Sequence, residues 1–312
     1  MVKLSTTISL LLICIALFGC DTKVKSQKKE LTTTSVSPEK DANIKQNTTS
    51  LTLFLNAAEK AFMQLQESGN TLQHTIKNFI QTPSPEHLNE AKKALLNTHH
   101  QYMLIQVFQK IDILHPEFDL LQSQPIVIHP LNIRLDQHPI IAGYLDAVPN
   151  YPASGLIFTE QVLSAEYLNN EHQFSDTAYV AIGFHALELM LMGGLNQTSK
   201  ERYLEFSNLG NTTEKSTYSD RRSRYVQLLT TLINDDIKKL SAAWTTDEGF
   251  YPQTLNELLP YESDRLIQQA YKIEEHALLQ IKEHEKDSHL DAIDERKAQL
   301  ALIFKNQNTE SN

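Results

Sequence analysis

Cysteine is almost absent from this chain of 312 residues, which contains only Cys14 and Cys20. Both lie in the first twenty residues, inside a predicted targeting segment. The rest of the chain therefore has no disulfide bond and no cysteine ligand for a metal. The folded part must be stabilised by a packed core, and about 290 residues are enough for one large domain or two small ones.

Basic residues are also few relative to acidic ones. The chain has 28 Lys and Arg against 38 Asp and Glu, a formal net charge of −10. A nucleic-acid-binding protein needs a basic face, so we expect no nucleic acid among the partners. The sequence also lacks a phosphate-binding loop, a serine nucleophile elbow, a paired-cysteine zinc motif and the His-Glu-x-x-His helix of zinc proteases.

One apolar run, Ile8 to Gly19, stands near the start, and it is too short to be a stable membrane span. It ends in Leu-Phe-Gly followed by Cys20, which resembles a bacterial lipobox. We expect residues 1–19 to be a lipoprotein signal peptide and Cys20 to carry the lipid; an ordinary signal peptide with an incidental cysteine is the simpler alternative. Asp21 resembles the signal that keeps lipoproteins in the inner membrane of enteric bacteria. These features predict a protein of the bacterial cell envelope that is held to the membrane by lipid and faces the periplasm.

Helical periodicity dominates the remainder of the chain. Residues 20–50 are rich in Lys, Thr, Ser, Gln and Asn and predict a flexible tether. From Leu51 onwards apolar residues recur at spacings of three and four, and alternation of period two is never sustained. We therefore expect an all-α fold over residues 51–305, followed by a tail at 306–312. The expected helices cover about 51–80, 85–111, 217–244, 258–285 and 288–305.

Proline is concentrated in one region, since six of the eleven prolines lie between Pro116 and Pro152. Such a density prevents a long helix. Tyr, Asp, Leu and Ile are nevertheless too frequent there for a disordered linker. Long ordered loops inside compact domains are usually functional. We expect a long, ordered, Pro-rich loop in the first half of the domain; a rigid connector whose tyrosines merely pack is the alternative.

The chemical candidate is a Gly-x-His-x-x-Glu motif formed by Gly183, His185 and Glu188, inside the apolar run from Tyr179 to Met192. His and Glu three positions apart on a helix lie about 60° from one another, so both side chains can reach one point. Imidazole and carboxylate groups are good ligands for zinc and iron. A solvated or mutually bonded pair without a metal is the simpler explanation of the motif.

Other polar residues are weaker candidates. His99 and His100 are adjacent, so they point about 100° apart on a helix and cannot both face one site; a surface or hydrogen-bonded histidine is the simpler explanation of each. The run from Glu274 to Asp287 could hold a metal, but a solvated helix face explains it better. Arg221 and Arg222 lie near the start of an expected helix, the unfavourable end for cations. We expect one of them to pair with Asp136, Asp146 or Glu188, unless they form a solvated basic turn.

Three motifs in register resemble the imelysin-like family, which is named after an insulin-cleaving membrane protease and includes iron-regulated bacterial surface proteins. They are Leu135-Asp136-Gln137-His138-Pro139 with Gly143-Tyr144-Leu145-Asp146, then Asn150-Tyr151-Pro152-Ala153-Ser154-Gly155, then the motif from Gly183 to Gly193. The resemblance covers residues 51 to 305. The chain departs from the family pattern at His138, where a Trp is expected, and at Gln106, where a Glu often stands.

The resemblance implies two helical-bundle halves, about 51–195 and 196–305, packed together with the motif at their interface. It implies one metal ion, iron or zinc, with His185 and Glu188 as ligands. The expected surrounding pocket consists of Asp136, His138, Tyr144, Asp146, Tyr151, Arg221 and Arg222.

Two classes of function follow from this resemblance. The first is a lipid-anchored protein of metal binding or iron uptake, working with other iron-uptake proteins of the envelope. The second is a metallopeptidase with Glu188 as ligand or general base. A hydrolytic zinc site needs three protein ligands, and no third ligand is evident in the sequence, so we favour binding over catalysis. A metal-free polar pocket is a further alternative.

Overall fold

The computed structural model describes residues 38–114, 128–193, 197–207, 213–245, 249–258 and 260–284. Within these ranges the chain forms helices, turns and loops, with no strand, and the prediction of an all-α fold is confirmed. The predicted signal peptide, Cys20, Asp21, the helix 288–305 and the tail 306–312 lie outside the described residues. None of the helices in the described ranges combines the length and the apolar character that a membrane crossing requires.

Long helices alternate with short ones in the described chain. Their bounds are α1 Pro38–Gln81, α2 Pro85–Leu104, α3 Gln106–Leu114, α5 Ile128–Asp136, α6 Ala142–Leu145, α7 Ala165–Glu171, α8 Phe184–Met192, α9 Ser199–Arg202, α10 Thr213–Trp244, α11 Phe250–Glu257 and α12 Pro260–His284, with 3₁₀ turns η2 Leu156–Phe158 and η3 Tyr203–Glu205.

Helix α1 begins earlier than the sequence predicted. Residues 38–50, expected to be part of the flexible tether, are helical. Pro38 occupies the first helical position, where its missing N–H is not needed. No glycine or proline interrupts the helix before Gly69, and α1 also continues through that glycine. A Cβ atom at residue 69 would lie 2.9 Å from Oδ1 of Asn234, so the glycine permits a close approach of α10.

Two other predicted segments differ from the structure. The expected helix 85–111 is divided at Ile105, so that α2 packs on α1 while α3 packs on α12. The Pro-rich region contains α5, because Pro130 lies in the first turn, where helical N–H groups have no partner. After α5, residues 137–183 form an ordered loop with only short helical turns.

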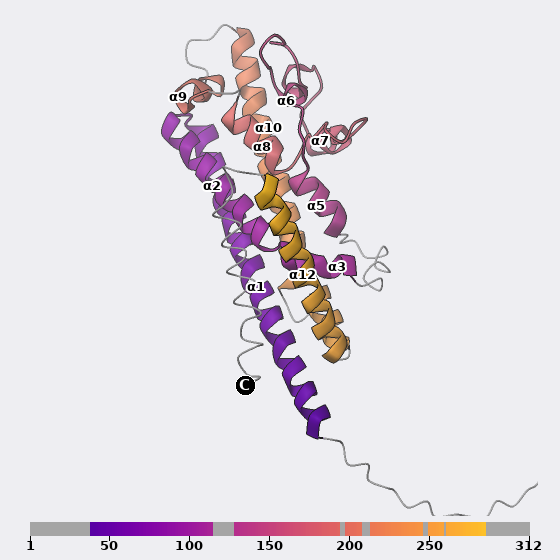
Figure 1. Ribbon diagram of the computed structural model, residues 1–312. Coiled ribbons are helices and arrows are strands. Elements are labelled where there is room, and N and C mark those ends of the chain that lie inside the picture. Colours follow the sequence, from indigo (N-terminus) through magenta and orange to yellow (C-terminus); the bar gives the residue numbers. More distant parts are fainter. Residues whose placement is uncertain are drawn as a thin grey trace, which may run out of the picture.

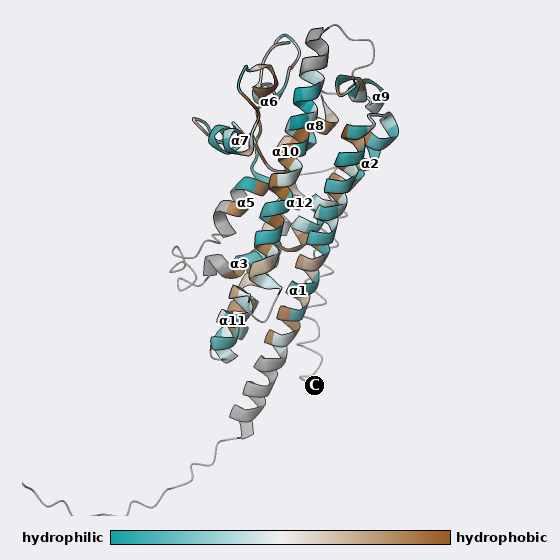
Figure 2. Ribbon diagram, turned by 180° about the vertical axis from the view of Figure 1, so that it is seen from behind, coloured by the Kyte–Doolittle hydropathy of each residue, from teal (hydrophilic) through white to brown (hydrophobic). Residues whose placement is uncertain are grey.

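Helices α1 and α10 run side by side along the molecule and organise the packing (Figure 1). Helices α2, α8 and α9 lie toward one end, and α3 and α12 toward the other, where Figure 2 also labels α11. Helices from both parts of the sequence, before and after residue 195, therefore pack against one another; the position of the boundary between two halves stays a prediction. Brown and teal alternate along α1 and α10 in Figure 2, as expected for helices with one apolar stripe.

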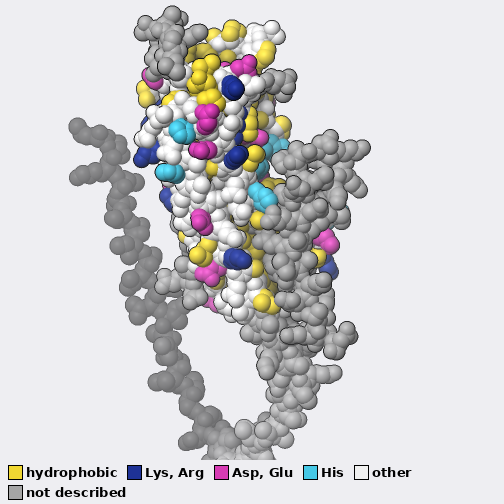
Figure 3. Space-filling model, turned by 90° about the vertical axis from the view of Figure 1, so that its left-hand side faces the viewer, with side chains coloured by type: hydrophobic (Ala, Val, Ile, Leu, Met, Phe, Trp, Pro, Cys, Tyr) yellow, Lys and Arg dark blue, Asp and Glu magenta, His cyan; other side chains and the backbone are white. Residues whose placement is uncertain are grey.

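An aromatic cluster joins four helices in the core. Trp244 of α10 stacks on Phe62 of α1, with ring centroids 5.5 Å apart, and on Tyr251 of α11, at 4.3 Å. Phe108 of α3 lies 5.9 Å from the same indole ring. Large buried aromatic rings of this kind contribute strongly to packing, which suits a folded part whose described residues include no cysteine. On the face drawn in Figure 3, basic and acidic side chains are interspersed rather than gathered by sign.

Candidate metal centre

A close contact between α5 and α8 positions the Gly-x-His-x-x-Glu motif. Gly183 precedes α8 and has φ +96°, a conformation that favours glycine. A Cβ atom there would lie 2.4 Å from the carbonyl oxygen of Arg134 and 2.7 Å from that of Leu135. Only glycine therefore lets the start of α8 rest against the end of α5. This contact brings Asp136, the last residue of α5, beside His185 in the first turn of α8.

Two histidines converge on the carboxylate of Asp136. Nε2 of His99, on α2, lies 2.7 Å from Oδ1 of Asp136, and Nε2 of His185 lies 3.2 Å from the same oxygen. The three side chains are each about one-fifth exposed, at 19%, 23% and 23%. Their potential ligand atoms all lie within 4.8 Å of one another. We call these three residues, His99, Asp136 and His185, the triad.

Hydrogen bonds control the charges of the triad. Burial would raise the pKa of Asp136, but the hydrogen bonds from His185 and His99 outweigh it and hold the pKa well below its usual range. Hydrogen bonds to Asp136 and Glu188 raise the pKa of His185 to about 9 despite its burial. Without a metal, the triad at neutral pH thus combines an ionised carboxylate with a protonated His185. A metal that used Nε2 of His185 would have to replace its proton.

Glu188 lies behind His185 rather than within the triad. Its Oε2 atom is 3.3 Å from Nδ1 of His185, the ring nitrogen that faces away from Asp136. The sequence predicted Glu188 as a metal ligand beside His185. That role stays a prediction; in the structure the carboxylate contacts the ring nitrogen opposite to the one near Asp136, a position from which it orients the imidazole.

The other predicted pocket residues divide into two groups. His138 lies near the triad, with its ring centroid 5.4 Å from that of His185. Tyr144 is instead stacked on Tyr179, and its hydroxyl lies 2.7 Å from both the carbonyl and Oε2 of Glu171. Tyr151 is 67% exposed and pairs through its backbone with Val148. The two tyrosines therefore shape the loop and contact other groups than the triad.

Asp146 is the centre of a separate buried ion network. Arg222 donates two hydrogen bonds of 2.8 Å to its carboxylate, a pairing that the sequence had suggested. Arg202 donates a third, at 3.2 Å, and also binds the carbonyl of Met190 in α8 and Glu205. The network joins the Pro-rich loop to α8 and α10. The network therefore fixes the position of the loop relative to α8, which carries the motif.

Arg221 has a similar structural role. Its guanidinium donates to the carbonyl oxygens of Ile157 at 2.7 Å, Gln161 at 2.9 Å and Leu156 at 3.1 Å. It therefore fastens the 3₁₀ turn η2 to α10. Both arginines hold the loop in place, and the structure does not bring either of them to the triad.

The contribution of this ion network to the stability of the fold should be lost at low pH. Burial would raise the pKa of Asp146, but the hydrogen bonds from Arg222 outweigh burial and lower it. A carboxyl with a lowered pKa stabilises the fold above its unfolded pKa of about 3.9, and this contribution is lost as the pH falls through the folded pKa. We expect Asp146→Asn to lower the free energy of unfolding at pH 7 by about 2 kcal/mol, because an amide leaves Arg222 and Arg202 buried without a counter-charge.

Denaturant unfolding from pH 7 down to pH 2 checks this expectation. Below about pH 4 the difference between wild type and Asp146→Asn should shrink. The exposed Asp235 offers the matched control, and Asp235→Asn should change little at either pH. A difference at pH 7 that persisted unchanged at pH 2 would contradict the assignment of the effect to the Asp146 charge.

Sequence reasoning missed two residues of this region. His99 was assigned to the surface or to an ordinary hydrogen bond, yet it belongs to the triad. The available signal was its position four residues after the buried Leu95 and three before the buried Tyr102, at the edge of the apolar stripe of α2. Nothing in the sequence marks Arg202, because it lies in a polar stretch and its burial depends on contacts with Asp146, Glu205 and the Met190 carbonyl.

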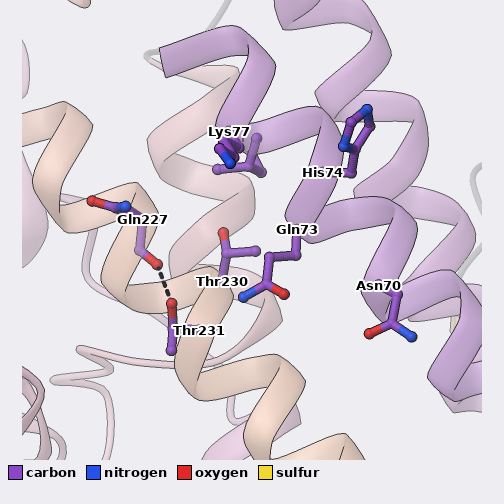
Figure 4. Close-up of a pocket in the computed structure, with 8 residues that line it drawn as sticks. Asn70, Gln73, His74, Lys77, Gln227, Thr230 and Thr231 are labelled. Carbon is purple, nitrogen blue, oxygen red and sulfur yellow. Dashed lines mark hydrogen bonds between the residues drawn. The ribbon is translucent and has the colours of Figure 1, made fainter. Parts of the chain in front are cut away.

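A hollow lies between α1 and α10, apart from the triad (Figure 4). Its volume is about 440 Å³, and its lining is mostly polar: Asn70, Gln73, His74, Ile76, Lys77, Gln227, Thr230 and Thr231. The Thr231 hydroxyl donates to the carbonyl of Gln227, 2.9 Å away. His74 is close to Asn78, at 3.1 Å. None of the residues predicted for the site lines this hollow.

Comparison with known proteins agrees with the motifs. The family model Imelysin, Peptidase_M75, matches residues 58–311, which include the whole triad, Glu188 and the ion network around Asp146. None of the curated proteins matches the chain. A match over most of the length establishes the family, and we conclude that the chain belongs to the imelysin family.

Proposed function

We propose that this protein binds one transition-metal ion, iron or zinc, at His99, Asp136 and His185. The observation that supports the proposal most is the convergence of two imidazole nitrogens on one carboxylate oxygen, at 2.7 and 3.2 Å, in a half-buried position between three helices. Imidazole and carboxylate donors suit both metals. Helix bundles commonly hold metals between facing helices in this way.

The residues fit such an ion in spacing as well as in chemistry. Ligand atoms held about 2.0–2.1 Å from a tetrahedral ion lie roughly 3.3 Å from one another. The two distances to Asp136 are 2.7 and 3.2 Å, and all three ligand atoms lie within 4.8 Å of one another, so the side chains would have to adjust around the ion. A bound ion would supply a positive charge beside Asp136 that the proton of His185 otherwise provides. His99, Asp136 and His185 would hold it, and Glu188 would orient His185.

The proposed setting is the bacterial cell envelope. The lipobox-like sequence before Cys20 supports lipid attachment, and Asp21 favours the inner membrane. In this setting the protein would bind metal in the periplasm and take part in uptake, together with other iron-uptake proteins of the envelope. Cys20→Ser tests the anchor: the variant should move from the membrane fraction to the soluble fraction. A variant that stayed with the membrane would contradict lipid attachment at Cys20.

Metal content of the full chain, purified in detergent, tests the binding function directly. We expect about one equivalent of iron or zinc per chain after loading and dialysis. A wild-type protein that retained neither metal under any loading condition would overturn the proposal. The triad would then be a metal-free polar cluster.

A metallopeptidase is the second candidate, and one observation favours it. His99 would supply a third protein ligand beside Asp136 and His185, and hydrolytic zinc sites usually have three. A bound ion of that kind polarises a carbonyl group and activates water. Glu188, however, contacts the side of His185 away from Asp136, so it is poorly placed as a general base. Cleavage of unfolded peptides by the zinc-loaded wild type, absent in Asp136→Asn, would establish peptidase activity.

The position of Glu188 leads to a prediction for metal affinity. Glu188→Gln should weaken metal binding by about 10- to 100-fold, the usual effect of removing a carboxylate that orients a ligand histidine. The amide retains a hydrogen bond but loses the charge. Competition against a chelator of known affinity measures the change. Glu90→Gln, at an exposed position of α2, is the matched control and should leave the affinity unchanged.

The size of the effect separates two roles for Glu188. Loss of a direct ligand should abolish binding at metal concentrations at which loss of an orienting residue only weakens it. A Glu188→Gln variant as inactive in metal binding as His185→Ala would contradict the orienting role and would restore the carboxylate as a ligand.

A further inference from the structure

We infer that His138 is a fourth metal ligand, which closes the site on its solvent side and gives it tetrahedral geometry. The inference rests on the proposed metal-binding function. His138 follows Asp136 by two residues, in the segment that leaves α5, and its side chain is exposed. Its ring lies edge-on to His185, with centroids 5.4 Å apart and an interplanar angle of 76°.

His99 approaches His185 in the same manner as His138. The ring centroids of His99 and His185 are also 5.4 Å apart, with an interplanar angle of 82°. His185 is thus flanked by two imidazoles at equal distances, and both stand nearly perpendicular to it. Together with Asp136, the three rings form a group of four potential ligands drawn from α2, α8 and the end of α5.

The spacing of the rings agrees with a tetrahedral ion. A metal about 2.05 Å from an imidazole nitrogen lies about 3.2 Å from the ring centroid. Two such rings at a tetrahedral angle then have centroids about 5.2 Å apart, whereas a right angle in an octahedron gives about 4.5 Å. The observed separation of 5.4 Å, found for both pairs, is close to the tetrahedral value; the nitrogens of His138 lie outside the 4.8 Å group formed by the triad, so its ring must rotate to bind the ion.

The surroundings of His138 leave its ring available. Its backbone carbonyl oxygen accepts a hydrogen bond from Nε2 of Gln137, at 3.2 Å. This bond involves the backbone of His138 and leaves its imidazole ring out. Within the described part of the chain the ring has no hydrogen bond of its own. An exposed imidazole can change rotamer at little cost, which allows it to complete a site whose other ligands are fixed by α2, α5 and α8.

A fourth protein ligand has a functional consequence. Closed four-ligand sites hold zinc-like ions without an open position, whereas catalytic sites keep one position free. Three imidazoles and one carboxylate favour a tetrahedral ion such as Zn²⁺ or Co²⁺ over an octahedral one. His138 would therefore direct this protein toward zinc-class ions and toward binding rather than hydrolysis.

Cobalt substitution tests the inference, because tetrahedral Co²⁺ absorbs visible light much more strongly than five- or six-coordinate Co²⁺. The full chain in detergent is titrated with Co²⁺ as wild type, His138→Ala, His74→Ala and Asp136→Asn. We expect intense absorption for wild type and for His74→Ala, whose exposed histidine lies on α1. His138→Ala should still bind one equivalent, with the absorption band shifted because water replaces the imidazole, and with affinity reduced about 10- to 100-fold.

The outcomes separate this inference from the proposed function. If His138→Ala has the spectrum and affinity of the wild type while Asp136→Asn binds no Co²⁺, the triad holds the ion and His138 is not a ligand. If the wild type binds no Co²⁺, the proposed function fails and the inference fails with it. Circular dichroism confirms that each variant is folded, which is expected for His138 because its side chain is exposed.

Discussion

Asp136→Asn is expected to lower metal affinity by on the order of a thousandfold, more than the loss of an orienting carboxylate costs. Asp136 is the only residue of the triad that both histidines contact, and its pKa is held low, so it provides a full negative charge at neutral pH. An amide is neutral and a poorer ligand for zinc or iron. Isothermal titration of the full chain with Zn²⁺ measures the loss.

Thermal unfolding provides a second measurement of the same effect. A ligand at one hundred times its dissociation constant stabilises the folded state by about 2.7 kcal/mol. Zn²⁺ at that concentration should raise the melting temperature of the wild type and leave Asp136→Asn nearly unchanged. Asp235→Asn on α10 is the control and should respond like the wild type. If Asp136→Asn kept wild-type stoichiometry and an affinity within about threefold, Asp136 would not be a ligand.

Gly183→Ala is expected to destabilise the fold by about 4 kcal/mol. Forcing alanine into the positive φ of Gly183 costs about 1–3 kcal/mol. The added methyl group would also overlap the carbonyl oxygen of Arg134, 2.4 Å away, and overpacking costs a further 1–3 kcal/mol. Relief of this overlap requires α8 to move away from α5, so metal affinity should fall as well. Denaturant unfolding and Zn²⁺ titration measure the two effects.

Gly143→Ala is the matched control for this substitution. Its added Cβ would meet the side chain of Val148 at 3.3 Å and Oγ of Ser154 at 3.7 Å, and its backbone is not in the left-handed region. We expect a change below about 1 kcal/mol. Equal stability losses in the two variants would show that the contact between α5 and α8 has no special role.

The helices were predictable because their apolar stripes repeat locally. Phe54, Ala58, Phe62 and Leu65 are all buried on α1, as their spacing indicated. The break at Ile105 was not predictable, since the apolar pattern continues across it. It depends on α12, which lies more than 150 positions later in the chain and packs on α3. The helical start at Pro38 was missed because residues 38–50 have few apolar side chains, although none of them prevents a helix.

The candidate site was only partly predictable for a related reason. His185, Asp136 and His138 were expected near one another because they lie in segments that resemble the family motifs, although His138 itself departs from the family pattern. His99 carries no motif, and it meets Asp136, 37 positions later in the sequence, only because α2, α5 and α8 fold together. Glu188 was expected beside His185 from helical spacing alone. That spacing places the two side chains together but cannot tell which nitrogen of the imidazole the carboxylate will face.

The pairing of α1 with α10 also affects how the chain can be made. The Ser241 hydroxyl of α10 donates to the carbonyl of Phe62 in α1, across 179 positions in the sequence. At a synthesis rate of about 5–20 residues per second, α10 would be made roughly 10–35 seconds after α1, and the apolar stripe of α1 would be exposed during that interval. Contacts between such distant segments slow folding and leave apolar surface exposed. We therefore expect that a chaperone, or delayed folding, protects the apolar stripe of α1 in the nascent chain until α10 has been made.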